Sequence, residues 1–240
     1  MKAVVLAGGT GTRLRPLTLL GNKHMLPVGK YPMIHYGIEG LRKAGITDIL
    51  LVTGREAVGS FAGYLGSGRE FGVSVTYTIQ EEAGGIAEAL QLARPFIREG
   101  EKFVLLLGDN LFDDDLTPYV EAYEKQPGGA MLLLKQVPDP QRYGIPVFRQ
   151  EGSIARIEEK PNNPDSNLCV TGIYMYDSHV FRLIDQIKPS DRGELEITDL
   201  NNVYAEAGLL TYRELPGWWT DAGTFESLKE AAAHVWEQNE

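Results

Sequence analysis

Near its N-terminus the sequence reads Lys2-Ala3-Val4-Val5-Leu6-Ala7-Gly8-Gly9-Thr10-Gly11-Thr12-Arg13-Leu14. Its first six residues form a short, largely apolar run with β-branched side chains, which predicts a buried strand. The glycines that follow have no Cβ, so the backbone can turn sharply and approach a ligand closely. A helical turn from about Arg13 would direct its free N–H groups at the same space. This arrangement suits a phosphate group.

The glycine spacing matches neither of the two familiar phosphate-binding loops. A Walker loop ends in Gly-Lys-Ser/Thr, and the dinucleotide fingerprint requires a glycine where Arg13 stands. Taken alone, the glycines are equally consistent with a tight turn that has only a structural role. Arg13 favours the phosphate-binding interpretation, because a guanidinium is a permanent, bidentate donor to phosphate. Lys23 adds a second cation ten residues later.

Composition limits the classes of protein to which the chain can belong. It has 240 residues, 43% of them hydrophobic, which allows a substantial core. The net charge of −10 disfavours binding to nucleic acid or to an anionic membrane, so we expect its cations to gather in one cleft. Cys169 is the only cysteine, which excludes an intramolecular disulfide and predicts a small buried residue in a strand. We see no signal peptide and no membrane-spanning run, and expect a cytoplasmic protein.

Apolar runs and helical periodicities alternate along the first half of the chain, which is typical of a parallel sheet in an α/β fold. We expect strands over 2–7, 48–54, 73–79 and 102–107, and helices over 33–44, 57–65, 86–97 and 118–125. In the second half we expect strands over 130–136, 145–148, 153–158 and 168–176, as a β-rich subregion inserted over the sheet. A helix is expected over 225–236. No linker divides the chain, so we predict a single domain over 1–240.

Polar groups follow two of the predicted strands at their carboxyl ends, where open α/β sheets bind ligands. Gln80 carries an amide that could pair with the edge of a nucleobase, and Gly84-Gly85 would let backbone groups come close. Asp109 and Asn110 follow a fully apolar strand, and a carboxylate in that place could hold Mg²⁺ together with substrate phosphates. The alternatives are an ordinary loop at Gln80 and an aspartate turn at Asp109.

Further segments of the second half carry groups able to contact a ligand. Individually each is also consistent with a turn, a strand edge, a helix cap or a core position. These segments are Tyr143-Gly144, Glu158-Glu159-Lys160-Pro161, Val170-Thr171-Gly172-Ile173-Tyr174, Arg192-Gly193-Glu194-Leu195-Glu196-Ile197-Thr198-Asp199 and Trp219-Thr220-Asp221-Ala222-Gly223.

Together the motifs are more specific than any one of them. Five occur in the order, and near the spacing, of the sugar nucleotidyltransferases, a family that the chain resembles over 1–224. They are Leu6–Leu14, Lys23-His24-Met25-Leu26-Pro27, Gly108-Asp109-Asn110, Glu158–Pro161 and Trp219–Gly223. Within the family the chain is most similar to members that use dTTP and glucose 1-phosphate, a match that Tyr143-Gly144 and Arg192–Asp199 strengthen.

The resemblance implies a three-layer, Rossmann-like α/β fold with a mostly parallel central sheet. Its nucleotide-binding half would cover about 1–110, and its β-rich sugar-binding half about 111–224. The implied reaction condenses dTTP with α-D-glucose 1-phosphate to dTDP-glucose and pyrophosphate, with Mg²⁺ as cofactor. The implied partners are small molecules, without nucleic acid or membrane, and a homo-oligomer stays open.

Motif positions carry the family's residue roles onto this chain. Catalytic roles would belong to Arg13, Lys23, Asp109 and Lys160, and metal binding to Asp109 and Asp221. The nucleotide would be held by Gly8, Gly9, Gly11, Thr12, Arg13, Gln80 and Gly85. The sugar phosphate would be held by Asn110, Tyr143, Gly144, Glu159, Lys160, Val170, Thr171, Tyr174 and Arg192.

The residue types fit this chemistry independently. A sugar phosphate is already ionised at neutral pH, so the reaction needs cations and a metal rather than a general base. Two departures from the family pattern, His24-Met25 and the loop Glu81–Ala87, lie near the base, and Gln80 alone does not separate thymine from cytosine. A transferase that uses UTP or CTP, one that acts on a phospho-alcohol, and a catalytically silent nucleotide-binding subunit therefore remain as alternatives.

Overall fold

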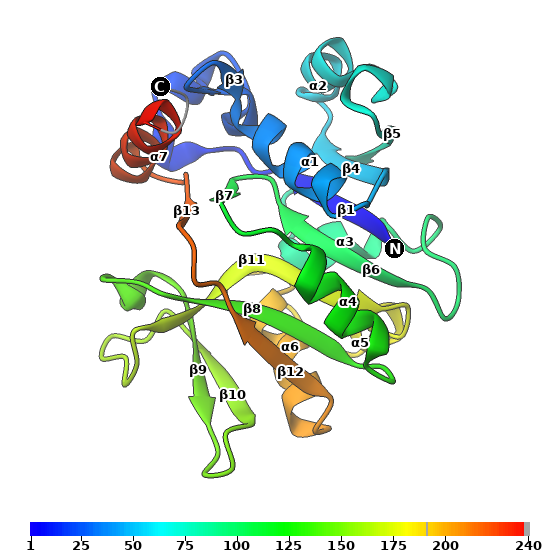
Figure 1. Ribbon diagram of the computed structural model, residues 1–240, viewed down its shortest axis with the longest axis vertical. Coiled ribbons are helices and arrows are strands. Elements are labelled where there is room, and N and C mark those ends of the chain that lie inside the picture. The colour runs from blue at the N-terminus through cyan, green and yellow to red at the C-terminus, as the bar shows by residue number, and fades with distance from the viewer. Residues whose placement is uncertain (191, 238–240) are drawn as a thin grey trace.

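A seven-stranded sheet forms the centre of the molecule, in the order β12-β8-β11-β6-β1-β4-β5 (Figure 1). The structure is a computed structural model that describes residues 1–190 and 192–237. Strand β11 runs antiparallel to both of its neighbours, and the other strand pairs of the sheet are parallel. The strands are β1 (Lys2–Ala7), β4 (Asp48–Gly54), β5 (Ser74–Gln80), β6 (Lys102–Leu107), β8 (Ala130–Gln136), β11 (Leu168–Asp177) and β12 (Leu210–Glu214).

Helices cover both faces of the sheet because its central strands are apolar on both faces. In β1, Val5 packs into one core cluster and Val4 into the other, as expected when successive side chains alternate between faces. One layer holds α1 (Met33–Lys43), α2 (Val58–Leu65) and α4 (Thr117–Lys125); the other holds α3 (Ile86–Gln91), α5 (Val180–Ile184) and α6 (Ile197–Glu206). The predicted three-layer α/β fold with a mostly parallel sheet is confirmed.

Smaller elements lie outside the central sheet. The hairpin of β9 (Gly144–Phe148) and β10 (Ile154–Glu159) projects at the end of the molecule opposite α2 (Figure 1). The others are β2 (Pro27–Val28), β3 (Tyr31–Pro32), β7 (Asn110–Phe112), β13 (Trp219–Asp221) and α7 (Phe225–Glu237), with 3₁₀ turns at Thr12–Leu14, Leu17–Leu19, Lys23–Met25, Arg69–Phe71 and Pro140–Arg142. None of the described helices has both the length and the apolar character that crossing a membrane requires.

Strand β12 and helices α5 and α6 were not among the expected elements, and three of the expected elements need correction. Strands β8 and β11 belong to the central sheet, because their apolar runs are buried on both faces. Of the strands expected in the β-rich subregion, β9 and β10 alone lie outside that sheet, as a hairpin. The helix expected over 86–97 ends at Gln91, and Pro95 cannot continue it. The helical turn expected from Arg13 is a single 3₁₀ turn, Thr12–Leu14, after which Pro16 again limits extension.

Candidate active site

A cavity of about 370 Å³ opens at the carboxyl ends of β1, β5 and β6. Gly8 follows β1, Gln80 ends β5 and Asp109 follows β6, so the parallel strands deliver all three to one edge. Every site residue predicted from the sequence lines this cavity except Gly11 and Thr12. A second hollow of about 1020 Å³ adjoins it and shares Gly8, Gly9, Gln80 and Ala83 with it.

The glycine loop is packed tightly against the segment that carries Lys23. Gly11 has a φ of +63°, and a Cβ there would lie 2.9 Å from the Cβ of Lys23 and 2.9 Å from the Cγ2 of Thr18. The Thr18 hydroxyl donates to the Gly11 carbonyl at 2.7 Å. Gly11 and Thr12 therefore shape the loop from behind, while Arg13, at its end, reaches the cavity.

Lys23 forms an ion pair with Asp109 inside the cavity. Burial alone would raise the pKa of Asp109, but the charge of Lys23 and the hydrogen bonds from Lys23 and Asn110 bring it below its ordinary value. The imidazole of His24 is buried beside this pair, with its Nδ1 at 2.7 Å from Asn22 Oδ1. Burial and then the charge of Lys23 lower the pKa of His24 to about 3, so His24 is neutral near pH 7.

Asn110 connects three parts of the site through its buried amide. Its Oδ1 accepts from the backbone N–H of Gly172 at 2.8 Å and from the indole N–H of Trp219 at 2.8 Å. Its Nδ2 donates to Asp109 Oδ1 at 3.1 Å. A Cβ on Gly172 would lie 2.3 Å from that Nδ2, so only glycine lets strand β11 approach this closely. Asn110 thus orients the Asp109 carboxylate and fixes β11 at its register shift between Val170 and Tyr174.

Strand pairing brings Asp221 next to Asp109. In the β7–β13 ladder Asp221 lies opposite Asn110, and the N–H of Ala222 donates to the Asp109 carbonyl at 2.9 Å. Burial and then the Asp109 charge raise the pKa of Asp221, against hydrogen bonding and charge from Tyr143, Arg142 and Arg13. Two neighbouring carboxylates at a cavity wall are the hard oxygen ligands that Mg²⁺ takes with substrate phosphates, so the residues present fit that ion.

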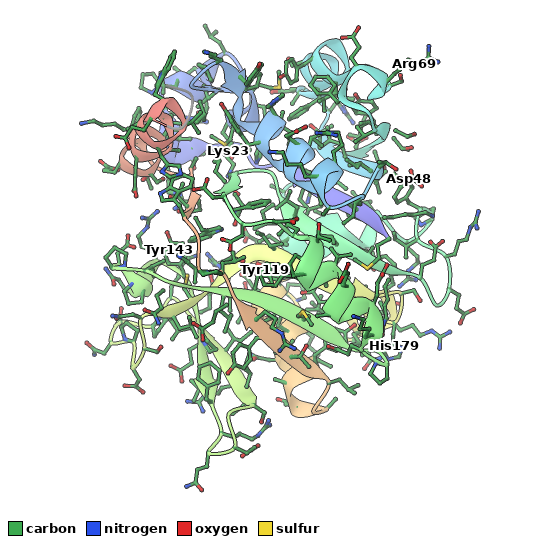
Figure 2. The ribbon with its side chains drawn as sticks, in the orientation of Figure 1. Lys23, Asp48, Arg69, Tyr119, Tyr143 and His179 are labelled. Carbon is green, nitrogen blue, oxygen red and sulfur yellow. The ribbon has the colours of Figure 1, made fainter. Side chains whose placement is uncertain are left out.

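Two further groups bond to Asp221 from the segment before β9. The Tyr143 hydroxyl donates to Asp221 Oδ1 at 2.9 Å, and Arg142 Nη2 lies 3.2 Å from the same oxygen. Arg13 approaches from the glycine loop, since a Cβ on Gly223 would lie 3.1 Å from its Nη2. Figure 2 shows Lys23 and Tyr143 toward the same side of the molecule, the side on which Figure 1 places β13.

The wall of the cavity opposite the glycine loop consists of side chains that form hydrogen bonds and ion pairs with one another. Glu159, at the end of β10, accepts from the Thr198 hydroxyl at 2.7 Å and lies 3.0 Å from the ammonium of Lys160. Lys160 has a φ of +46°, uncommon for a residue with a side chain, and its N–H donates to the Tyr143 carbonyl at 3.0 Å. Arg192 pairs with Glu196 at 2.8 Å. Gly144, Val170, Thr171 and Tyr174 complete this wall.

The loop after β5 closes the remaining side. Gly85 has a φ of +107°, and a Cβ there would lie 2.4 Å from the carbonyl oxygen of Leu195. The Leu195 N–H donates to the Gly84 carbonyl at 2.8 Å, and the Leu195 carbonyl accepts from Ala87 N–H at 3.1 Å. These bonds join the loop near Gln80 to the segment that carries Arg192 and Thr198.

Sequence reasoning did not select Arg142, Thr198 or Glu196 as site residues. Arg142 directly precedes Tyr143-Gly144, and the expectation that an acidic chain gathers its cations in one cleft could have pointed to it. Thr198 and Glu196 lie within the quoted segment Arg192–Asp199, but nothing local to that segment indicates which side chains face the cavity.

Comparisons with known proteins agree with this geometry. A glucose-1-phosphate thymidylyltransferase of Neisseria meningitidis serogroup A is 43% identical over 238 residues, which cover 98% of this chain and 82% of that protein. A Bacillus anthracis structure assigned as a glucose-1-phosphate thymidylyltransferase, in complex with sucrose, has a TM-score of 0.93 at 53% identity and covers 98% of this chain and 95% of its own. A UDP-glucose pyrophosphorylase complexed with UDP-glucose has a TM-score of 0.88 at 26% identity, with coverages of 99% and 98%.

The sequence profile of the nucleotidyl transferase family matches residues 2–238, nearly the whole chain. The match includes the glycine loop, both neighbouring carboxylates and the side-chain wall around Glu159. This chain therefore belongs to the nucleotidyl transferase family.

Proposed function

We propose that this chain is a glucose-1-phosphate thymidylyltransferase. It condenses dTTP with α-D-glucose 1-phosphate to give dTDP-glucose and pyrophosphate, with Mg²⁺ as cofactor and small molecules as its substrates. The identity to thymidylyltransferases over nearly the full chain supports the choice of substrates. One structural observation carries the proposal. The neighbouring carboxylates Asp109 and Asp221 lie in a cavity with the glycine-loop cation Arg13 and the sugar-side cation Lys160.

The two ends of the cavity fit the two substrates. Gly8, Gly9, Arg13, Gln80 and Gly85 line the end formed by the glycine loop and the loop after β5, which suits a nucleotide. The opposite end supplies carboxylate, hydroxyl and cationic groups, which suit the hydroxyls and phosphate of a sugar phosphate. The substrates would then meet at Asp109 and Asp221.

The chain's own residues act mainly by neutralising and positioning charge. A phosphate oxygen of the sugar phosphate attacks the α-phosphorus of dTTP, and the bond from that phosphorus to the bridging oxygen of pyrophosphate breaks. Lys160 and Arg192 hold the attacking phosphate, while Arg13 and Lys23 face the triphosphate and oppose the charge that grows on pyrophosphate. The nucleophile is already ionised near pH 7, so no side chain has to remove a proton.

Asp109 and Asp221 are the residues that would hold Mg²⁺. When bound, the ion would supply positive charge to the phosphate oxygens. In the structure Lys23 pairs with Asp109 and Arg142 with Asp221, so both carboxylates already have cationic partners on the protein. Exchange of these partners for the ion and the substrate phosphates would free Lys23 and Arg142 to contact the triphosphate.

Direct attack predicts inversion of configuration at the α-phosphorus. The reaction run with one diastereomer of the α-phosphorothioate of dTTP should give the inverted product. Retention would indicate two displacements and a covalent enzyme intermediate, which would contradict this mechanism.

A second candidate is a uridylyltransferase, because the UDP-glucose pyrophosphorylase fold overlays this chain closely. The deciding experiment measures pyrophosphate release with Mg²⁺ and glucose 1-phosphate, using dTTP, UTP, CTP and GTP in parallel. Preference for dTTP supports the proposal, whereas preference for UTP supports the second candidate. Nucleotide binding without release from any pair would contradict both and identify a silent nucleotide-binding subunit.

A further inference from the structure

Gln80 stands at the base end of the cavity with its amide pressed against the first glycine of the loop. The residue is 9% exposed and lines both hollows of the site. A Cβ on Gly8 would lie 2.6 Å from Gln80 Oε1. The amide oxygen therefore occupies the space that any other residue at position 8 would fill, and this contact places it at the cavity wall.

Glu88, in the first turn of α3, approaches the other end of the same amide. Its Oε1 accepts from Gln80 Nε2 in a long hydrogen bond of 3.4 Å. Its Oε2 lies 1.2 Å from where a Cβ on Gly84 would stand. The carboxylate thus fits into a space that exists only because residue 84 is glycine. Two side chains, Gln80 and Glu88, each use the missing side chain of a glycine to reach this arrangement.

We propose that Glu88 is a positioning residue that determines base specificity, by holding the Gln80 amide with its oxygen toward Gly8 and its nitrogen toward α3. The proposal rests on the proposed function, since it names how that nucleotide site reads its base. It follows that the site selects pyrimidines that carry an N–H at N3, which are thymine and uracil, and rejects cytosine.

The physical basis is that a carboxylate only accepts hydrogen bonds. If the Gln80 amide turned over, its Oε1 would face Glu88 Oε1 at the 3.4 Å now spanned by the amide nitrogen, and two acceptors would repel. A hydrogen bond to a charged acceptor is stronger than one between neutral groups, and the long distance here makes this one a weak member of that class. Glu88 therefore fixes which end of the amide is donor and which is acceptor.

The fixed amide presents an acceptor and a donor side by side in one order. Thymine and uracil present the complementary order, an N3–H next to a carbonyl oxygen. Cytosine presents a bare N3 next to an amino group, so in the same place it would set acceptor against acceptor and donor against donor. A site built to pair polar groups rejects a ligand that leaves them unpaired.

The test measures nucleotide binding, so that it does not depend on turnover. Dissociation constants of dTTP, UTP and CTP are determined by titration calorimetry with Mg²⁺ and without a sugar phosphate. Wild-type protein should bind dTTP and UTP at least ~10-fold more tightly than CTP. Glu88→Met removes the acceptor at similar length, and should lower the dTTP-to-CTP affinity ratio by ~10-fold. Glu88→Gln keeps an oxygen able to accept, and should restore the ratio to within ~3-fold of wild type.

A second variant tests the same geometry without touching Glu88. In Gly84→Ala the new Cβ would overlap the Glu88 carboxylate and displace it, so this variant should lower the ratio as Glu88→Met does. The double variant should lose no more than either single one, because both break one contact. Glu70→Met is the matched control. It removes an exposed carboxylate from the turn Arg69–Phe71, outside both hollows, and should keep the wild-type ratio.

Three outcomes would overturn the proposal: a wild-type protein without preference for dTTP over CTP, an unchanged ratio in both Glu88→Met and Gly84→Ala, or equal loss in Glu88→Met and Glu88→Gln. Failure of the proposed function is separate. A protein that keeps the predicted binding ratios but releases no pyrophosphate from dTTP would sink the thymidylyltransferase assignment while supporting this reading of the base.

Discussion

The two ends of the cavity are built in different ways. On the nucleotide side the groups come from two contiguous segments, residues 8–13 and 80–88. Glycines set the geometry of these segments, because the absence of a Cβ lets neighbouring groups pack closely. On the sugar side the groups come from β9, β10, β11 and α6, and side chains hold side chains, as Thr198 holds Glu159. Adding a methyl group to a glycine should therefore impair binding on the nucleotide side most. Removing a side-chain hydroxyl should impair binding on the sugar side most.

Asp109 belongs to neither end alone, so its loss should exceed any damage confined to one side. Asp109→Asn keeps the shape of the side chain and removes the charge that holds Lys23 and would hold Mg²⁺. We expect kcat to fall at least ~100-fold, from the loss of a charge contact that acts in the transition state. Steady-state pyrophosphate release measures this.

The matched control for that prediction is Asp48→Asn, which removes a carboxylate at the amino end of β4, away from the cavity (Figure 2). It should stay within ~2-fold of wild type, as surface substitutions usually do. Near-normal turnover in Asp109→Asn would mean that the reacting phosphates lie elsewhere.

Gly11→Ala tests the nucleotide side. The methyl group would meet Lys23 and Thr18 at 2.9 Å, and φ is +63°, so the loop must shift. With a conformational cost of about 1–3 kcal/mol, we expect the KM for dTTP to rise ~10–30-fold and that for glucose 1-phosphate to change little. Gly59→Ala, in an exposed turn of α2 where an added Cβ would have no described tertiary neighbour within 4 Å, should leave both constants unchanged. Equal rises in both KM values would refute the division between the two sides.

Thr198→Val tests the sugar side. It removes the hydroxyl that donates to Glu159 at 2.7 Å and keeps the volume of the side chain. Loss of one hydrogen bond to a carboxylate, about 1.5 kcal/mol, should raise the KM for glucose 1-phosphate ~10-fold and leave the KM for dTTP alone. Thr211→Val removes a comparable hydroxyl from β12, outside the cavity, and serves as the control. A rise in the KM for dTTP instead of the KM for glucose 1-phosphate would contradict the placement of Glu159 on the sugar side.

The last prediction concerns the buried neutral His24 and its effect on stability rather than on catalysis. Its pKa is about 3 in the folded chain and near 6.5 when exposed, so between these values the unfolded chain binds the extra proton. Stability that is present above pH 6.5 is therefore lost as the pH falls. Between pH 7 and pH 5 wild type should lose about 2 kcal/mol more than His24→Gln. Urea unfolding at both pH values measures the difference, and parallel losses in the two proteins would contradict a buried neutral histidine.

Local patterns in the sequence were enough for the four strands β1, β4, β5 and β6 of the sheet and for the nucleotide side of the site. Apolar runs at β1, β4 and β6, alternating with helical periodicity, indicate a parallel sheet, because each strand must bury both faces. Glycine spacing and the polar residues after strands mark the nucleotide side, because parallel strands place their carboxyl ends together. The helix expected over 86–97 ends at Gln91, before Pro95, which local rules could also have indicated.

Contacts between distant segments were decided only by the tertiary structure. Asp221 lies opposite Asn110 because β13 returns to β7, and Asn110 is seated by Gly172 and Trp219, which are 62 and 109 positions away. Neither the strand pairing nor the hydrogen bonds of Asn110 can be predicted from local sequence patterns, because both depend on how the layers pack. The sequence by itself determined the fold class, the family and the residue types of the site; packing decided that Asp109 and Asp221 are neighbours and that Glu88 orients Gln80.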